Sequence, residues 1–417
     1  MVPEIHGLNV LVLNPGSATL KFGLYQMPAA SAASNASNPA TVLASGVVER
    51  IGTPQSEIRL LVPSGTPVAE AVEADTPAQG TEHAIRLLRA HVSDHAQAPT
   101  VIDAVGCRVV HGGAALVQPT RVTPSVLDEL RALRALAPLH LPWDIAVLEQ
   151  VGRSLPGAPV VAVFDTAFHQ TLPDVARTYA LPLELCARYG LRRYGFHGIS
   201  HAYVSRQQIQ RLGRGPKGTR IISCHLGSGA SACAVRDGLS IDTSMGLTPM
   251  EGLVMGTRSG DVDPGLVLYL IRTLGMTAGE VDDLLNHQSG LHGLSGISAD
   301  LRDLEKAALE NDRRAELALE IFAYRACKYI GAFAAALEGL DAIAFTGGIG
   351  ERSAPMRSRI CRRLAFLGLR LDEERNSAAS GREMPISVEG SDVQAWVIPT
   401  DEEREIALSV SDALATG

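Results

Sequence analysis

Residues 9–25 read Asn-Val-Leu-Val-Leu-Asn-Pro-Gly-Ser-Ala-Thr-Leu-Lys-Phe-Gly-Leu-Tyr, and this stretch decides the fold class. Its two apolar runs, Asn9–Leu13 and Thr19–Tyr25, have the composition of buried strands, and Asn-Pro-Gly-Ser forms the turn between them. The same strand–turn–strand pattern recurs at Arg220–Val235, where the turn reads His-Leu-Gly-Ser-Gly. We interpret the two units as an internal duplication of one nucleotide-binding domain. The alternative is that two Gly-Ser hairpins arose independently.

The chain is long enough for two domains, and strands alternate with helices along it. Its 417 residues exceed the roughly 250–300 at which a single core stops growing. Alternation of predicted strands and helices is typical of the α/β class. The predicted strands are Val101–Val110, Pro159–Phe164, Ala342–Phe345 and Ala395–Ile398, and the predicted helices are Thr81–His91, Thr123–Leu136, Glu316–Leu340 and a terminal helix after Glu403.

Composition argues against several partners and locations. The formal net charge is −8 without a basic tract, which disfavours nucleic acid as a partner. No run of about 18 apolar residues occurs, so no membrane span is expected. The six cysteines are scattered without a Cys-x-x-Cys pair, which predicts reduced thiols and a cytoplasmic protein. The polar run Ala29–Ala40 predicts a flexible loop.

Three glycine turns, each directly after a predicted strand, indicate bound phosphate. Glycine lets backbone N–H groups approach an anion closely and adopts the positive φ that aims several of them at one site. One such turn is usually an ordinary loop, but three together favour nucleotide binding. None matches a P-loop or a dinucleotide fingerprint. The turns lie at Gly16, at Gly227 and Gly229, and at Gly347, Gly348 and Gly350.

Charged residues near strand ends are candidates for phosphoryl transfer, which requires positive charge and Mg²⁺. Arg108 and Arg258 lie between small residues and glycines, which favours anion binding over a solvated surface role. Asp165 and Glu402 follow buried strands, where α/β sheets bind ligands. The alternative for both acids is a role at a helix N-terminus. Lys21 lies beside the first glycine turn, where it adds charge or serves only as a strand-edge lysine.

His197, in Arg-Tyr-Gly-Phe-His-Gly-Ile-Ser-His, is the strongest histidine candidate. A positioned imidazole can donate a hydrogen bond to a transferring phosphoryl group. His140, His169, His201 and His225 also lie in motif-like stretches, although a lone histidine is more often a structural group.

These stretches together resemble the acetokinase family of the acetate and sugar kinase/heat-shock/actin superfamily. The matches extend over nearly the whole chain, and Asp242–Pro249 with Gly256–Pro264 is close to diagnostic. The resemblance implies an α/β fold of two duplicated actin-like (ribonuclease H-like) domains with a cleft between them, residues 1–165 plus 398–417 and residues 166–397. It also implies a homodimer and reversible in-line phosphoryl transfer from ATP to acetate, giving acetyl phosphate and ADP.

The resemblance assigns roles to residues at matching positions. A carboxylate is already ionised at pH 7, so no general base is needed, and catalysis would rest on positioning and charge. The catalytic residues would be Asp165, Arg108, Arg258 and His197, of which His197 and Arg258 would stabilise the transition state. Arg108 would also bind the substrate carboxylate, and the apolar pocket around the acetate methyl would comprise Val110, Leu139, Phe196 and Pro249, with His140 and His225 beside it.

The metal and the nucleotide would be held by a second set of residues. Asn14 and Glu402 would bind Mg²⁺, or Mn²⁺ in its place. The residues that would bind ATP are Ser17, Thr19, Lys21, His225, Gly227, Ser228, Gly229, Gly347, Gly348 and Gly350.

Several positions depart from the family pattern, and two other functions stay open beside acetate kinase activity. The departures affect nucleotide affinity, the phosphoryl donor and the exact acid, so a propionate kinase or another short-chain carboxylate kinase is the second hypothesis. A non-catalytic nucleotide-binding switch of the actin or chaperone kind is the third. The departing residues are Pro15, Ala18, Cys107, Leu141-Pro142-Trp143, Ile199 and Ser228.

Overall fold

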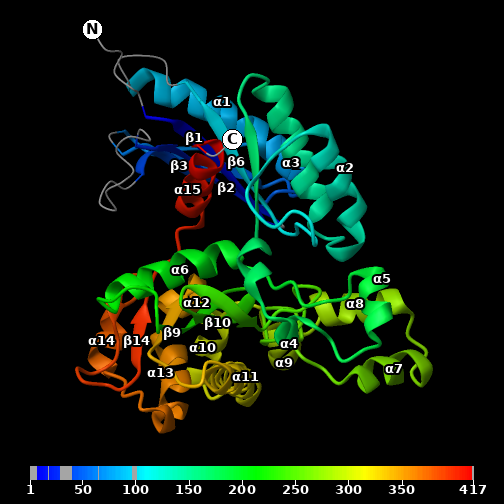
Figure 1. Ribbon diagram of the computed structural model, residues 1–417, viewed down its shortest axis with the longest axis vertical. Helices are drawn as coiled ribbons and strands as arrows, with labels where there is room; N and C mark the ends of the chain where they lie inside the picture. Colours follow the sequence, from blue (N-terminus) through cyan, green and yellow to red (C-terminus); the bar gives the residue numbers. More distant parts are fainter. Residues whose placement is uncertain (1–6, 17, 29–39, 64, 96–100, 416–417) are drawn as a thin grey trace. The chain divides into compact units, whose positions relative to one another are not determined.

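The computed structural model describes residues 7–16, 18–28, 40–63, 65–95 and 101–415, and its helices and strands are drawn in Figure 1. They form two compact units, Met1–Ala167 with Asp401–Gly417 and Phe168–Thr400. The division into domains at residues 165 and 398 stays a prediction. The run predicted as a flexible loop lies outside the described residues except for Ala40. Within the described ranges, no helix is long and apolar enough to cross a membrane.

The first unit contains an eight-stranded sheet in the order β5-β4-β3-β2-β1-β6-β8-β7. Along β5-β4-β3-β2-β1 each adjacent pair is antiparallel, whereas β1, β6 and β8 are parallel to one another. The short β7 pairs antiparallel with β8. The strands are β1 Asn9–Pro15, β2 Thr19–Gln26, β3 Thr41–Glu49, β4 Glu57–Leu61, β5 Val68–Ala71, β6 Ala104–Val109, β7 Thr120–Arg121 and β8 Val160–Phe164.

Helices cover both faces of this sheet. Successive residues of a strand point to opposite faces, so neighbouring residues of β6 contact different helices. Leu13 and Cys107 belong to a core cluster with residues of α1 and α3. Gly106 faces α15 instead, since a Cβ at this position would lie 2.6 Å from Ile406 Cγ2. The helices of this unit are α1 Pro77–His95, α2 Pro124–Ala132, the 3₁₀ helix η2 Leu133–Leu136, α3 Leu141–Ser154 and α15 Glu402–Ala415.

The second unit contains a six-stranded sheet in the order β11-β10-β9-β12-β14-β13. Helix α6 packs on it through Val204, which contacts Ala344 of β12. Helix α11 contacts β9 and β10, and Figure 1 shows α6 and α11 on opposite sides of the sheet. The strands are β9 Arg220–Leu226, β10 Ala230–Arg236, β11 Leu239–Thr243, β12 Ala342–Thr346, β13 Met384–Pro385 and β14 Gln394–Val397.

The second unit contains most of the helices, and α7 to α11 lie between strands β11 and β12 in the sequence. The 3₁₀ helix η3 Ala167–Thr171 spans the boundary between the two units. The others are α4 Asp174–Arg177, α5 Leu183–Tyr189, α6 Gly198–Arg211, α7 Pro264–Arg272, α8 Ala278–His287, α9 Gly290–Ser295, α10 Leu301–Leu309, α11 Arg313–Ala336, α12 Gly347–Arg352, α13 Ala354–Arg363, the 3₁₀ helix η4 Ala365–Leu367 and α14 Glu373–Ala378.

The two sheets share one topology. Five consecutive strands run β3-β2-β1-β6-β8 in the first sheet and β11-β10-β9-β12-β14 in the second. In each, three antiparallel strands are followed by two strands parallel to the first of the hairpin. This correspondence supports a duplication, and the α/β class with two sheets is confirmed.

Three expectations about local structure are wrong. Asn14 and Pro15 were predicted in the first turn, but both belong to β1 and pair with Lys21 and Leu20 of β2. A glycine turn was predicted at Gly347, Gly348 and Gly350, but a short helix, α12, begins at Gly347. The reason is that the Glu351 side chain folds back and accepts the Gly347 N–H at 3.0 Å, which satisfies a helix-terminal donor. Thr123–Leu136 was predicted as one helix, but its α-helical part ends at Ala132 and the last turn tightens into η2.

Gly106→Ala is expected to destabilise the protein, because the added Cβ would lie 2.6 Å from Ile406 and 2.7 Å from Val410 of α15. Overpacking of this kind costs about 1–3 kcal/mol. Gly152→Ala is the matched control, since that helical glycine has open space around its missing Cβ and alanine is favoured in helices by about 1 kcal/mol. Thermal unfolding checks both changes, and equal midpoints for the two variants would contradict the packing assigned to α15.

Candidate active site

Three predicted site residues come together at the carboxyl ends of the parallel strands in the first unit. Asn14 lies near the end of β1, Arg108 lies near the end of β6, and Asp165 directly follows β8. The strand registers place these ends level with one another, since Leu13 pairs with Cys107 and Arg108 pairs with Val163. Sheets of this class bind ligands at this edge.

Arg108 is held side-on by the buried Asp165 carboxylate. Its Nε lies 3.1 Å from both carboxylate oxygens, and its Nη2 lies 2.5 Å from Oδ2. Its Nη1 donates to the Pro15 carbonyl oxygen at 2.8 Å. A guanidinium has about five N–H donors, so among the described residues these contacts leave one on each terminal nitrogen. The remaining pair suits a second carboxylate or a phosphate.

Asp144 is a site residue that sequence reasoning did not identify. It lies in the first turn of α3, and its Oδ2 accepts a 2.9 Å hydrogen bond from the Val110 N–H. Burial raises the pKa of Asp144 to about 7, although the Val110 N–H and the Arg108 charge both favour the carboxylate. In the sequence its only signal was one acidic residue early in a helix, which usually reflects the helix dipole.

Asn14 bridges two glutamates at the start of α15. Its Nδ2 donates to Glu402 Oε2 and to Glu403 Oε1, both at 2.8 Å. Glu403 was missed, because its partner Asn14 is 389 residues away and the sequence does not show that Asn14 contacts both adjacent acids. Burial raises the pKa of Glu403, and the nearby Lys21 charge opposes that rise.

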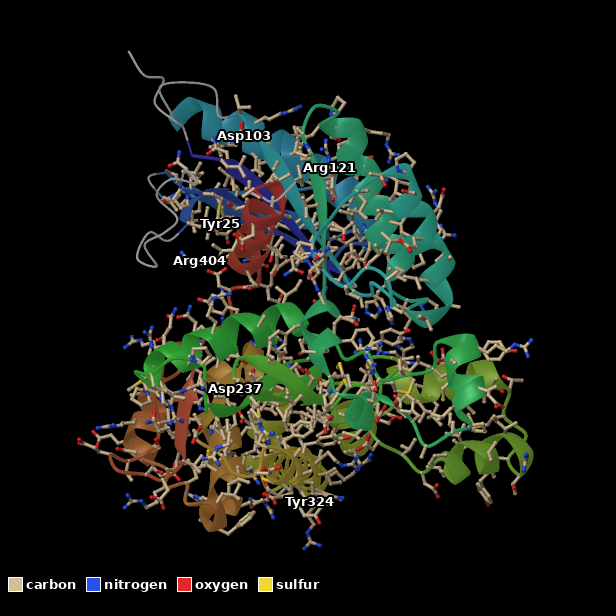
Figure 2. All side chains as sticks on the ribbon, viewed as in Figure 1. Tyr25, Asp103, Arg121, Asp237, Tyr324 and Arg404 are labelled. Carbon is tan, nitrogen blue, oxygen red and sulfur yellow. The ribbon has the colours of Figure 1, made fainter. Side chains whose placement is uncertain are left out.

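The start of α15 is anchored beside β2, where Figure 2 labels Tyr25 and Arg404. Burial raises the pKa of Tyr25, and the neighbouring Asp401 raises it further through its charge and a hydrogen bond. The Arg404 Nη2 donates to the Ala40 carbonyl oxygen at 3.3 Å. These contacts tie the start of α15, which carries the two glutamates, to neighbouring segments of the same unit.

The donor set around Asn14 fits a hard divalent cation. Two carboxylates and an amide oxygen are ligand types that Mg²⁺ takes when water and phosphate oxygens complete its shell. In the described part of the chain, no group of three or more His, Cys, Asp or Glu gathers as a metal site. These residues would therefore supply only part of the coordination shell.

The other predicted residues of the first unit vary in exposure. Lys21 and Thr19 are exposed on β2, where Lys21 pairs with Asn14 across the hairpin. Val110 is buried, whereas Leu139 is 42% exposed, so only Val110 is enclosed within its own unit. His140 directly precedes α3. Ser17 lies outside the described residues.

In the second unit, His197 and Arg258 converge on Gly229. A Cβ at Gly229 would lie 3.4 Å from the His197 ring and 3.8 Å from Arg258 Nη1. His197 has φ 55° directly before α6, a rare conformation outside glycine. Its ring stacks on His225 at 4.4 Å. Arg258 Nη1 donates to the Pro249 carbonyl oxygen at 3.1 Å, so five predicted residues form one group.

A buried hydroxyl network supports this group. The Ser231 hydroxyl lies 2.9 Å from His197 Nδ1 and 2.8 Å from His201 Nε2, and Ser223 Oγ lies 3.0 Å from His201 Nδ1. Burial holds the pKa of His201 well below its usual range, and it lowers the pKa of His169 to about 4. Both rings are therefore neutral structural groups, and Ser231 is a contact of the predicted site that its sequence context did not reveal.

Phe196 is buried, and its carbonyl oxygen lies 3.0 Å from His169 Nε2. The structure therefore gives Phe196 a packing role in its own unit. The predicted pocket residues Phe196 and Pro249 belong to the second unit, whereas Val110 and Leu139 belong to the first.

Three residues of the predicted glycine loops in the second unit line a cavity of about 520 Å³. Gly227, Ser228 and Gly348 contribute to it, and this volume lies in the range of small-molecule sites. Gly347 is set back from the cavity: its φ is +74°, and a Cβ there would lie 2.7 Å from the Leu226 carbonyl oxygen. The cavity is also lined by residues that the sequence did not single out, namely Ala299, Asp300, Leu301, Arg302, Glu305, Ile349, Arg352 and Ser353.

Comparison with known proteins identifies the family. The acetokinase family model matches residues 9–408. The chain belongs to the acetokinase family. It is 46% identical to the acetate kinase of Phocaeicola vulgatus, over 98% of this chain and 99% of that protein. As a member of this family it is a phosphotransferase, a kinase that transfers phosphate to a carboxylate.

Solved structures of this family have the same fold. Porphyromonas gingivalis acetate kinase is 41% identical, with a TM-score of 0.85 over 98% of this chain and 100% of that one. A propionate kinase from Francisella tularensis is 38% identical, also with a TM-score of 0.85, over 96% of this chain and 98% of that one. These matches establish the actin-like fold class expected from the sequence.

Most departures from the acetokinase pattern are accommodated by packing or by the backbone. Pro15 lacks an N–H, but its carbonyl oxygen accepts from Arg108. Cys107 and Ile199 are buried core residues. Ser228 lines the 520 Å³ cavity, and its carbonyl oxygen accepts from Gly256 N at 2.8 Å. Trp143 is 40% exposed at the start of α3.

Proposed function

We propose that this protein catalyses reversible phosphoryl transfer from ATP to acetate, giving acetyl phosphate and ADP. The observation that carries the proposal is the Arg108 guanidinium. Asp165 and the Pro15 carbonyl oxygen hold it, and among the described residues one N–H on each terminal nitrogen remains for a ligand. Two parallel donors recognise a carboxylate in bidentate fashion. The proposal is further supported by the acetate kinases that share 46% identity with this chain.

The mechanism relies on positioning and charge. Acetate is ionised at neutral pH, so it attacks the γ-phosphorus directly and ADP leaves on the opposite side of the phosphorus. Arg108 binds and orients the carboxylate, and Asp165 orients Arg108. Arg258 and His197 donate hydrogen bonds to the transferring phosphoryl group, whose negative charge they stabilise. No residue is required to remove a proton.

The nucleotide is assigned to the 520 Å³ cavity and the loops beside it. We propose that adenosine occupies this cavity and that the backbone at Gly227–Gly229 and Gly348–Gly350 faces the phosphates. Thr19, Lys21 and His225 stay predicted nucleotide-binding residues. The Gly347 N–H is not part of this set, because it already donates to Glu351.

Asn14 and Glu402 would hold Mg²⁺, or Mn²⁺ in its place, and Glu403 joins them because it shares the Asn14 amide. The ion would supply positive charge to the phosphate oxygens. We also propose a cytoplasmic location, since all six cysteines are free thiols.

A homodimer is supported by helix α7. None of its residues is buried, although it carries Leu266, Leu268, Tyr269 and Ile271. Each of these side chains is 36–52% exposed. A short helix with this much exposed apolar surface is typical of an association site, and we propose a second copy of the chain as its partner.

Arg108→Lys and Arg258→Lys are each expected to lower kcat/KM for acetate about 10²–10³-fold, because lysine keeps the charge but loses the planar donor pair. Trapping of the acyl phosphate as the hydroxamate measures the rate. Arg134→Lys, at an exposed arginine of η2, is the control. If either site variant keeps the wild-type rate, its arginine does not act as proposed. Absence of hydroxamate from the wild type with Mg-ATP would instead favour the nucleotide-binding switch.

The wild type is expected to prefer acetate over propionate by about tenfold or more in kcat/KM, because one methylene in an apolar pocket is worth about 1–3 kcal/mol. Val110→Ala should narrow this preference by enlarging the pocket. Steady-state rates with acetate, propionate and butyrate test both statements. A flat wild-type profile would remove the acetate assignment and favour a broader short-chain carboxylate kinase.

Light scattering is expected to give twice the chain mass of 44.1 kDa. Leu268→Asp should convert the protein to monomers, because it places a charge in the proposed interface. Leu309→Asp is the matched control, since Leu309 lies on α10 and is 86% exposed. A dimer that survives Leu268→Asp would exclude α7 as the contact.

A further inference from the structure

We propose that Asp144 is a positioning residue of the acid site, which fixes the backbone of Val110 and whose negative charge, when present, weakens carboxylate binding at Arg108. This inference rests on the proposed function, because it takes the acid to bind at Arg108 and Val110. It predicts that proton loss from one buried carboxyl group controls acid affinity near neutral pH.

The positioning part follows from how the end of β6 is held. The Val110 N–H donates to Asp144 Oδ2 at 2.9 Å, and the carbonyl oxygen of Val109 accepts from Asp165 N at 3.0 Å. The Asp144 side chain and the Asp165 backbone therefore fix consecutive residues just after Arg108. The Asp144 contact joins the first turn of α3 to the residue assigned to the acetate methyl.

The charge part follows from the groups that surround Arg108. Asp165 already neutralises the guanidinium through a bidentate contact. An ionised Asp144 adds a second negative charge that acts on the same arginine, and Glu402 from α15 adds a third. An anionic substrate must approach against this field, which is weakly screened because Asp144 is only 3% exposed.

Among the described residues, the titratable groups that interact with Asp144 are Arg108 and Cys107 from β6 and Asp165 after β8. Burial raises the pKa of Asp144 to about 7, Arg108 opposes the rise, and Asp165 adds to it. Burial also raises the pKa of the Cys107 thiol, which stays neutral over the same range. Asp144 is therefore the member of this group that changes charge near pH 7.

A purely structural role makes a different prediction. A neutral amide oxygen accepts the Val110 N–H as well as a carboxyl oxygen does, so Asp144→Asn keeps the backbone contact and removes only the charge. Asp144→Ala removes both. The two variants thus separate the positioning effect from the charge effect.

The experiment measures acetate KM and kcat from pH 6 to 9 at saturating Mg-ATP for the wild type, Asp144→Asn and Asp144→Ala. The exposed Asp128→Asn on α2 is the control. Acetate KM of the wild type should rise above about pH 7, approaching tenfold per pH unit at most, while kcat changes little. Asp144→Asn should abolish that rise, and Asp144→Ala should increase KM at every pH and narrow the preference for acetate over propionate.

Thermal unfolding from pH 5 to 8 reports the same proton without a rate measurement. A carboxyl group whose pKa is raised by folding costs stability as pH rises from its unfolded value, about 3.9, towards its folded value. The midpoint of Asp144→Asn relative to the wild type should therefore increase from pH 5 to about pH 7 and level off above it, whereas that of Asp128→Asn should not change.

The possible results separate failure of the proposed function from failure of the charge effect and from failure of the positioning effect. A wild type that makes no acyl phosphate overturns the proposed function, and this inference with it. An active wild type whose acetate KM follows the same pH course as that of Asp144→Asn overturns only the charge effect, and wild-type KM in a folded Asp144→Ala overturns the positioning effect. If Asp144→Ala does not fold, the midpoint trend and KM course of Asp144→Asn decide the inference on their own.

Discussion

The buried ion pair between Arg108 and Asp165 is the interaction on which the chemistry of the first unit depends. An arginine without a partner at this position would destabilise the fold. Removing one member of a buried ion pair costs about 3–5 kcal/mol of stability, because the other charge stays buried and uncompensated. Asp165 removes that cost and fixes the plane of the guanidinium through a side-on contact. The parallel strands β6 and β8 bring the two residues together, so sheet topology determines where positive charge is available to a ligand.

The second unit repeats the strand topology with different chemistry. Its site is organised by neutral groups, since hydroxyls flank His201 and burial holds the pKa of that ring low. Arg258 supplies the positive charge beside His197 and Gly229. One duplicated sheet thus carries an ion-paired arginine in one copy and a hydroxyl-supported histidine in the other. This division matches the proposed tasks of holding a small acid and holding a phosphoryl group.

Sequence reasoning predicted the elements that have strong local signals. The hairpin around Asn14, the strand before Asp165 and the long helix α11 follow from apolar runs and turn residues, and the structure contains all three. The helical start at Gly347 was missed, because it depends on a side chain four residues away that folds back onto the backbone. Asp144 and Glu403 were missed for a related reason: each acquires its partner from a segment distant in sequence.

The sequence by itself determined the α/β class, the duplicated hairpins and most residue types of the candidate site, because these depend on local periodicity and on motifs that the chain carries intact. Only the tertiary structure decided which donors are already occupied and which carboxyl groups are buried. The Arg108 guanidinium is engaged by Asp165, the Gly347 N–H is engaged by Glu351, and Asp144 is enclosed beside Val110. Burial and hydrogen-bond partners arise from contacts between distant segments. They determine the pKa of each carboxyl group and which N–H donors can bind a ligand.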